Sequence, residues 1–144
     1  MKEITLTNRK FVNAFLPAFN GLVNLPSNKQ SGKLKYAIKR SIDNIQEALD
    51  EYNKKRIIIF EDRAKVDENG NPIMGEDGSY IFESAAKRRQ AFDEFDKLND
   101  TKITISVFPI NKEVIDEIGG ISIGQELNLL DFIIDEENVE KEKQ

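Results

Sequence analysis

The sequence predicts an α+β protein in which a long-helix hairpin and an N-terminal helix pack on a small β-sheet, with a short C-terminal helix. Three observations support this prediction. Apolar residues recur at helical spacing over residues 32–65, a second helical pattern begins after Ser84, and apolar and polar residues alternate over residues 101–108. We expect a single domain over residues 1–135, followed by an acidic flexible tail over residues 136–144.

The first helix is predicted to follow Thr7, whose hydroxyl can cap it. Pro17 lies inside the helical pattern, lacks a backbone donor and clashes one turn back, so we expect a kink or break over residues 13–16. We interpret the apolar face of this helix as core, and the alternative is a partner-binding face. The residues of that face are Phe11, Phe15, Phe19, Leu22 and Val23.

A long helix is predicted over residues 32–65, with Ser31 as its N-cap. A helix of about 34 residues runs about 50 Å, which is longer than a domain of this size is wide. It is therefore expected to project, to pair with a second helix or to pair with another chain. The run at residues 56–60 is apolar all round, which predicts fuller burial than in the earlier turns or a change of packing partner, with a switch to strand as the alternative. The residues that we assign to partner binding on its apolar stripe are Leu34, Ile38, Ile42, Ile45 and Leu49.

Residues 66–82 contain two turn dipeptides, Asn69-Gly70 and Asp77-Gly78. Short β-segments on either side of the second turn can pair, so this segment is either a hairpin or a mobile loop. A second helical arm is expected from Ser84 to about Asn99, which makes an antiparallel helical hairpin of unequal arms. If the shorter arm pairs from the tip, the Gly32–Ile45 end of the long helix stays uncovered and needs a partner.

The C-terminal third is predicted to contain a strand over residues 101–108, which ends at Pro109. A short helix over residues 112–118 is closed by two glycines. We then expect a brief strand over residues 121–123 and a last apolar helix over residues 125–134.

Composition excludes several classes of function. The chain has no Cys and no His, which removes thiol catalysis, histidine general bases and nearly every structural zinc site. A net charge of −5 argues against nucleic-acid binding, which needs a basic surface. No apolar run approaches the roughly 18 residues of a transmembrane helix, and no signal peptide is recognised. We therefore expect no enzyme, no cofactor, no metal and no membrane segment.

Two sequence motifs resemble known ion and phosphate sites but are incomplete. Asp67-x-Asn69-x-Asn71 matches the start of an EF-hand loop, whereas Pro72 and Gly78 replace the required glycine and the closing glutamate. Ser31-Gly32-Lys33 matches the end of a phosphate loop, but the earlier glycine and the magnesium-binding hydroxyl are missing. Neither motif therefore predicts calcium binding or nucleotide hydrolysis.

Basic residues gather where the long helix begins, and there the backbone donors and the helix dipole favour anions. This cluster can hold a small anionic, nucleotide-like ligand, or it can be a solvated basic end. The candidate ligand-binding residues are Lys29, Lys33, Lys35, Lys39 and Arg40.

The order of several segments resembles a group of small bacteriophage proteins of uncharacterised function. The segments are Leu25-Pro26, Gly32-Lys33-Leu34-x-Tyr36, the long charged helix, the Asp/Asn/Gly turns, Ile121-Ser122-Ile123 and Leu129-Leu130-Asp131-Phe132-Ile133-Ile134. The resemblance implies a phage origin and a small accessory role, and it assigns no catalytic residue. The expected location is then the host-cell cytoplasm or the virion.

The leading hypothesis is a non-enzymatic phage interaction protein that binds a host or virion protein, or assembles with itself, through the long helix. The alternative is a protein that sequesters a small nucleotide-like signal and so counters host defence. The first rests on the length and apolar stripe of the helix, and the second on its basic start.

Overall fold

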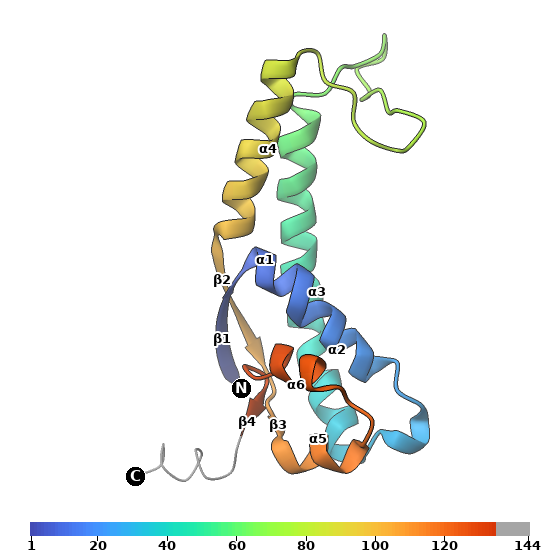
Figure 1. Ribbon diagram of the computed structural model, residues 1–144, viewed down its shortest axis with the longest axis vertical. Helices are drawn as coiled ribbons and strands as arrows, with labels where there is room; N and C mark the ends of the chain where they lie inside the picture. The colour runs from blue at the N-terminus through green and yellow to red at the C-terminus, as the bar shows by residue number, and fades with distance from the viewer. Residues whose placement is uncertain (135–144) are drawn as a thin grey trace. The chain divides into compact units, whose positions relative to one another are not determined.

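A computed structural model describes residues 1–134 of the 144-residue chain and confirms the α+β class (Figure 1). The chain divides into two compact units. The sheet unit comprises Met1–Ala48 and the described residues from Lys102 onward, and the hairpin unit comprises Leu49–Thr101. The single domain expected over residues 1–135 stays a prediction. The tail expected over residues 136–144 lies outside the described residues.

The sheet unit contains an antiparallel pair of strands, β1 (Lys2–Thr7) and β2 (Lys102–Val107). Strand β2 confirms the prediction over residues 101–108. In β1, Ile4 lies opposite Ile105 and both are buried. Strand β1 was not expected from the sequence, although apolar and polar residues alternate along it.

Three short helical segments follow β1: α1 (Asn8–Lys10), a π-helical turn (Phe11–Phe15) and α2 (Leu16–Val23). The Thr7 hydroxyl accepts a hydrogen bond from the Lys10 N–H at 3.1 Å, which confirms the cap. The break expected near Pro17 takes the form of the π turn, because the Leu16 N–H bonds the Phe11 carbonyl five residues back. The phenylalanine stripe is core, as interpreted, and the side chains buried in it are Phe11, Phe15, Phe19 and Leu22.

Helix α3 (Gly32–Glu61) is the predicted long helix, and it ends at Glu61 rather than at residue 65. The Ser31 hydroxyl accepts from the Leu34 N–H at 3.2 Å, so the predicted N-cap is confirmed. The helix ends early because the backbone of Lys65 joins the turn segment, where its N–H bonds the Ile81 carbonyl at 2.7 Å. Residues 56–60 remain helical, so the alternative of a strand there is wrong. The fuller burial expected there is also wrong for Ile57 and Ile58, which are 39% and 58% exposed.

The hairpin unit pairs the last turns of α3 with α4 (Ala85–Asp100), as predicted (Figure 1). The Ser84 hydroxyl caps α4 by accepting from the Lys87 N–H at 3.1 Å. Residues 64–82 pair through the isolated bridges Ala64–Phe82, Val66–Pro72 and Met74–Tyr80. Both predicted turns are present, since Gly70 and Gly78 have φ values of 80° and 81°, which favour glycine.

The C-terminal part of the sheet unit contains β3 (Ile110–Asn111), α5 (Lys112–Ile118), α6 (Ile123–Asn128) and β4 (Ile133–Ile134). Helix α5 is as predicted. The strand expected over residues 121–123 is wrong, because the Ser122 hydroxyl accepts from the Gln125 N–H at 3.1 Å and caps α6.

The short C-terminal helix is confirmed as α6, but its expected extension to residue 134 is wrong, because α6 ends at Asn128. Leu129 and Phe132 turn into the core, where both are fully buried. The Phe132 ring packs edge-on against Phe15 and Phe19. The two isoleucines of β4 then pair in parallel with β3. Tertiary burial therefore outweighs helical spacing at this end of the described chain.

Candidate binding sites

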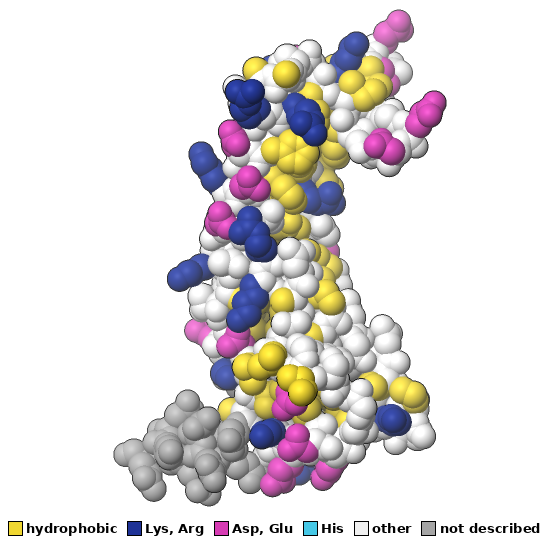
Figure 2. Space-filling view, in the orientation of Figure 1, with side chains coloured by type: hydrophobic (Ala, Val, Ile, Leu, Met, Phe, Trp, Pro, Cys, Tyr) yellow, Lys and Arg dark blue, Asp and Glu magenta, His cyan; other side chains and the backbone are white. Residues whose placement is uncertain are grey.

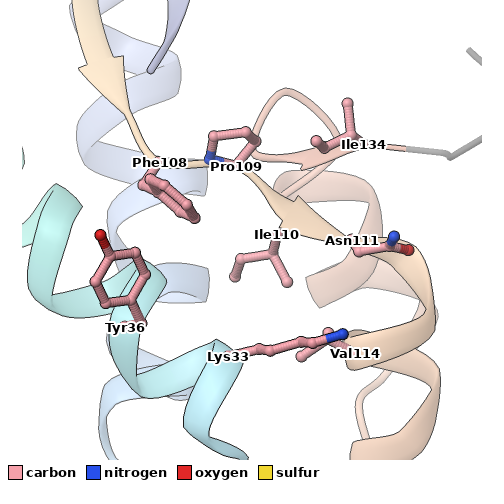
Figure 3. Close-up of a pocket in the computed structure, with 8 residues that line it drawn as sticks. All are labelled: Lys33, Tyr36, Phe108, Pro109, Ile110, Asn111, Val114 and Ile134. Atoms are coloured by element: carbon pink, nitrogen blue, oxygen red, sulfur yellow. The ribbon is translucent and has the colours of Figure 1, made fainter. Parts of the chain in front are cut away.

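A pocket of about 370 Å³ opens in the sheet unit between the start of α3, strand β3 and helix α5 (Figure 3). Most of its wall is apolar. The apolar and aromatic lining residues are Tyr36, Phe108, Pro109, Ile110, Val114 and Ile134. Two other side chains, Lys33 and Asn111, complete the lining. The volume falls within the range of about 300–1,000 Å³ that is typical of small-molecule sites.

The pocket wall at Phe108 is held by helix α3. The buried Ser41 hydroxyl accepts from the Phe108 N–H at 2.8 Å and donates to the Phe108 carbonyl at 3.4 Å. Asn44 Nδ2 donates to the Ser106 carbonyl at 2.9 Å. These side chains bond backbone groups at the end of β2 and directly after it, so they fix where the chain leaves the sheet and enters the pocket wall.

Aromatic residues join the helix and the strand end at the pocket. The Tyr36 and Phe108 rings meet edge to face, with 5.0 Å between centroids. The Arg40 guanidinium lies 5.7 Å from the Tyr36 centroid and 5.9 Å from the Phe108 centroid, and Arg40 Nη1 donates to the Tyr36 hydroxyl at 2.9 Å. The Tyr36 ring is therefore braced on two sides, although the residue is 48% exposed.

Of the predicted ligand-binding residues, the structure places only Lys33 in the pocket lining. Its side chain extends along the wall toward Val114 (Figure 3). Arg40 lies beside the pocket, against Tyr36. Lys35 and Lys39 are exposed and, at about 100° per residue, lie roughly 200° and 240° round the helix from Lys33. The predicted basic cluster, with Lys29 in the preceding 3₁₀ turn Ser27–Lys29, is therefore divided.

A second surface lies in the hairpin unit, and we call it the Phe92 surface. It combines a hollow lined by Ala85, Arg88, Arg89, Phe92 and Asp93 with the adjoining aromatic residues Phe60, Tyr80 and Phe82. Phe92 is 41% exposed, although its ring lies 5.4 Å from that of Phe60 and 6.3 Å from that of Phe82, measured between centroids. The Arg88 guanidinium stacks over it at 5.0 Å.

Figure 2 shows hydrophobic side chains gathered on this unit with Lys and Arg beside them. Further exposed apolar residues of the hairpin unit are Ile57, Ile58, Val66, Met74 and Ile81. Such a concentration of exposed apolar and arginine side chains is typical of protein-binding surfaces.

The partner-binding residues predicted on α3 have different environments. Leu34 and Ile45 are 0% and 2% exposed, so they belong to the core of the sheet unit. The expectation that the Gly32–Ile45 end lies uncovered is therefore wrong. Ile42 is 39% exposed, whereas Ile38 and Leu49 are half-buried, and their role in partner binding stays a prediction.

Sequence reasoning missed most of the pocket. Tyr36 and Phe108 come from segments about 70 residues apart, and loop closure over such a distance leaves no local signal. One signal was readable: Ser41 and Asn44 are polar residues at helical spacing beside the buried stripe, which indicates that they bond buried backbone.

The described residues hold no group of three or more Asp or Glu side chains that could bind a metal ion. None of the described helices is long and apolar enough to cross a membrane. Comparisons with protein-family models, with curated proteins and with solved structures find no match to this chain.

Proposed function

We propose that this chain is a non-enzymatic binding protein that contacts another protein, or a second copy of itself, through the Phe92 surface. The observation that carries the proposal is Phe92 itself. Its ring is seated on Phe60 and Phe82, stacked by Arg88 and still 41% exposed. The long helix contributes from beneath the surface, because the buried Phe60 of α3 supports the Phe92 ring.

The make-up of this surface supports a protein partner. Aromatic residues, Met and Arg are enriched at protein interfaces, and binding energy concentrates in aromatic and arginine side chains that sit in packed surroundings. Phe92 meets this description, since its position is fixed by two other rings before any partner arrives. A fixed ring loses little conformational freedom on binding, which favours affinity.

The chemistry of the two hollows favours binding over catalysis. Among the described residues, the ionisable side chains that line the sheet-unit pocket are Lys33 and Tyr36, and those that line the hollow of the Phe92 surface are Arg88, Arg89 and Asp93. Over these residues, neither hollow combines a general base with a matched general acid.

The resemblance to small phage proteins fits this proposal. The partner is then a host or virion protein, and the chain acts in the host cytoplasm or in the virion.

The test replaces Phe92 with serine and compares it with the matched control Ile123→Ser. Ile123 is an apolar side chain in the sheet unit that is 78% exposed, so its loss should not disturb the fold. Light scattering and sedimentation velocity over a wide concentration range measure self-association, and a photo-reactive side chain at either position measures contact with a host or virion protein. We expect F92S to abolish self-association and I123S to leave it intact, or the photo-reactive side chain to crosslink a host or virion protein from position 92 and not from position 123. The proposal is overturned if positions 92 and 123 behave alike in both assays.

A second candidate function is the sequestering of a small ligand in the sheet-unit pocket. The observation that favours it is the position of Lys33, a single cation on an apolar wall. A shift in melting temperature on adding small anions, lost when Lys33 is replaced, would support it.

A further inference from the structure

We infer that the sheet-unit pocket binds a small organic anion, one apolar body of about two rings bearing a single carboxylate that pairs with Lys33. This inference rests on the second candidate function and names the class of ligand that the pocket would sequester. It differs from the nucleotide-like ligand expected from the sequence.

The apolar body follows from the volume and the wall. An engineered cavity of about 150 Å³ holds benzene, and the pocket offers about 370 Å³. There is thus room for a body of about two rings. Ile110 and Val114 are buried side chains at the base of the wall, and the Tyr36 and Phe108 rings meet edge to face beside them. Burying an apolar ring against such a wall gains about 25 cal/mol per Å² of area removed from water.

The single negative charge follows from Lys33. Within residues 1–134, its ammonium group is the one cation in the lining and has no carboxylate at ion-pair distance. Two other polar groups of the lining act as acceptors: the Tyr36 hydroxyl accepts from Arg40, and Asn111 Oδ1 accepts from the Glu113 N–H at 3.0 Å. A ligand carboxylate therefore meets one charged donor, Lys33, with the apolar body on the wall beside it.

The same inventory disfavours a nucleotide. A base and a ribose need several donors and acceptors, and polar groups buried without partners cost about 1–3 kcal/mol each. A phosphate chain is usually held by several backbone N–H groups and cations. Among the described residues, the lining supplies one cation for that purpose, Lys33, because Arg40 bonds the Tyr36 hydroxyl beside the pocket and Lys35 and Lys39 lie on the other side of the helix.

The test uses three probes on the full chain: 1-naphthylacetate, its neutral analogue 1-naphthylacetamide, and adenosine monophosphate. Titration calorimetry measures affinity, and the methyl NMR signals of Ile110 and Val114 report where the probe binds. We expect the carboxylate to bind about tenfold more tightly than the amide, the usual weight of one charged hydrogen bond. Both probes should shift the Ile110 and Val114 methyl signals.

Two variants separate the ion pair from general charge. Lys33→Met keeps the apolar stem and removes the ammonium group. The carboxylate and the amide should then bind this variant with equal affinity, and the affinity for the amide should match that of the parent. Lys35→Met removes one positive charge from the same helix, outside the pocket, and should leave the tenfold preference intact.

Each of the other outcomes contradicts one part of the proposal. Equal affinity for carboxylate and amide, or an equal loss in K33M and K35M, overturns the pairing with Lys33. Binding of adenosine monophosphate without binding of naphthylacetate overturns the ligand class and leaves the sequestering function standing. If no probe binds at millimolar concentration, the ligand class and the sequestering function fall together.

Discussion

Replacing Ser41 with alanine tests whether one hydroxyl holds the pocket wall in place. Ser41 is 0% exposed, and its Oγ accepts from the Phe108 N–H at 2.8 Å and donates to the Phe108 carbonyl at 3.4 Å. Strand β2 ends at Val107, so the register with β1 does not extend to Phe108. In the variant, the Phe108 N–H therefore loses the bond partner that the helix supplies.

The cost follows from these contacts. The 3.4 Å bond is long and adds little, so the main loss is the bond at 2.8 Å. Leaving a buried N–H without a partner costs about 1–3 kcal/mol. Alanine returns up to about 0.5 kcal/mol, because it has the higher helix propensity. We therefore expect a net destabilisation of about 1.5 kcal/mol, which shifts the urea midpoint down by about 0.7 M for a slope of about 2 kcal/mol per M.

Urea unfolding followed by circular dichroism measures the midpoint, and amide hydrogen exchange measures protection of the Phe108 N–H. The matched control is Lys39→Ala on the exposed side of the same helix, which should stay within about 0.5 kcal/mol of the parent. In S41A, the Phe108 amide should exchange faster, whereas the Ile105 amide in the middle of β2 should change only with global stability. A Phe108 amide as well protected as in the parent would refute the role assigned to Ser41.

Two further predictions concern other parts of the chain. Hydrogen bonds from Ser79, first from its backbone N–H and then from its hydroxyl, hold the pKa of Asp77 below its ordinary value of 3.8. Because the pKa of Asp77 is lower in the folded protein, this turn is stabilised above about pH 3.8 and loses that contribution as the pH falls through the folded pKa. Carbon NMR of the Asp77 carboxyl should show the lowered pKa, and D77A should remove the pH dependence of the stability of the turn. A methyl group at Gly21 would meet the Gln125 amide, so G21A should be less favourable in the parent than in a Q125A background. In that background, helix propensity should make G21A stabilising by about 0.5–1 kcal/mol. A double-mutant cycle measured by thermal unfolding should show coupling between the two positions, and additive effects of G21A and Q125A would contradict the contact.

The helix starts were predictable because their signals are local. Ser31 and Ser84 each cap a helix by accepting a hydrogen bond from the backbone N–H three residues later, so both partners of the bond lie close together in the sequence. The same holds for the two turns of residues 66–82, where Gly70 and Gly78 have the positive φ that their dipeptides require. The position of Pro17 predicted a break in the helix, and in the structure this break is the π turn of residues 11–15.

The strand pairs were not predictable in the same way. Ile4 pairs with Ile105 and Ile110 with Ile133, so the burial that makes each segment a strand depends on residues far along the chain. The last predicted helix stops at Asn128 rather than at residue 134 for the same reason, because Phe132 is held by Phe15 and Phe19. Helical spacing alone carries no information about such distant packing.

The sequence predicted one residue of the candidate pocket but not its apolar wall. Lys33 was singled out from its place at a helix start, and the structure keeps it as the cation of the pocket. The other predicted lysines fall on other faces, because a cluster in sequence spreads round a helix at about 100° per residue. The apolar wall came only from the fold, and it changes the expected ligand from a nucleotide to an apolar carboxylate.

The two candidate surfaces lie in different compact units, and this makes their functions separable. Phe92 belongs to the hairpin unit and Lys33 to the sheet unit, and each is anchored by contacts within its own unit. Substitutions at sites without shared partners usually act independently. F92S should therefore leave naphthylacetate affinity unchanged, and K33M should leave protein association unchanged. If either variant alters both activities, ligand binding and partner binding are coupled, and the chain is then a ligand-controlled interaction protein rather than a carrier of two separate sites.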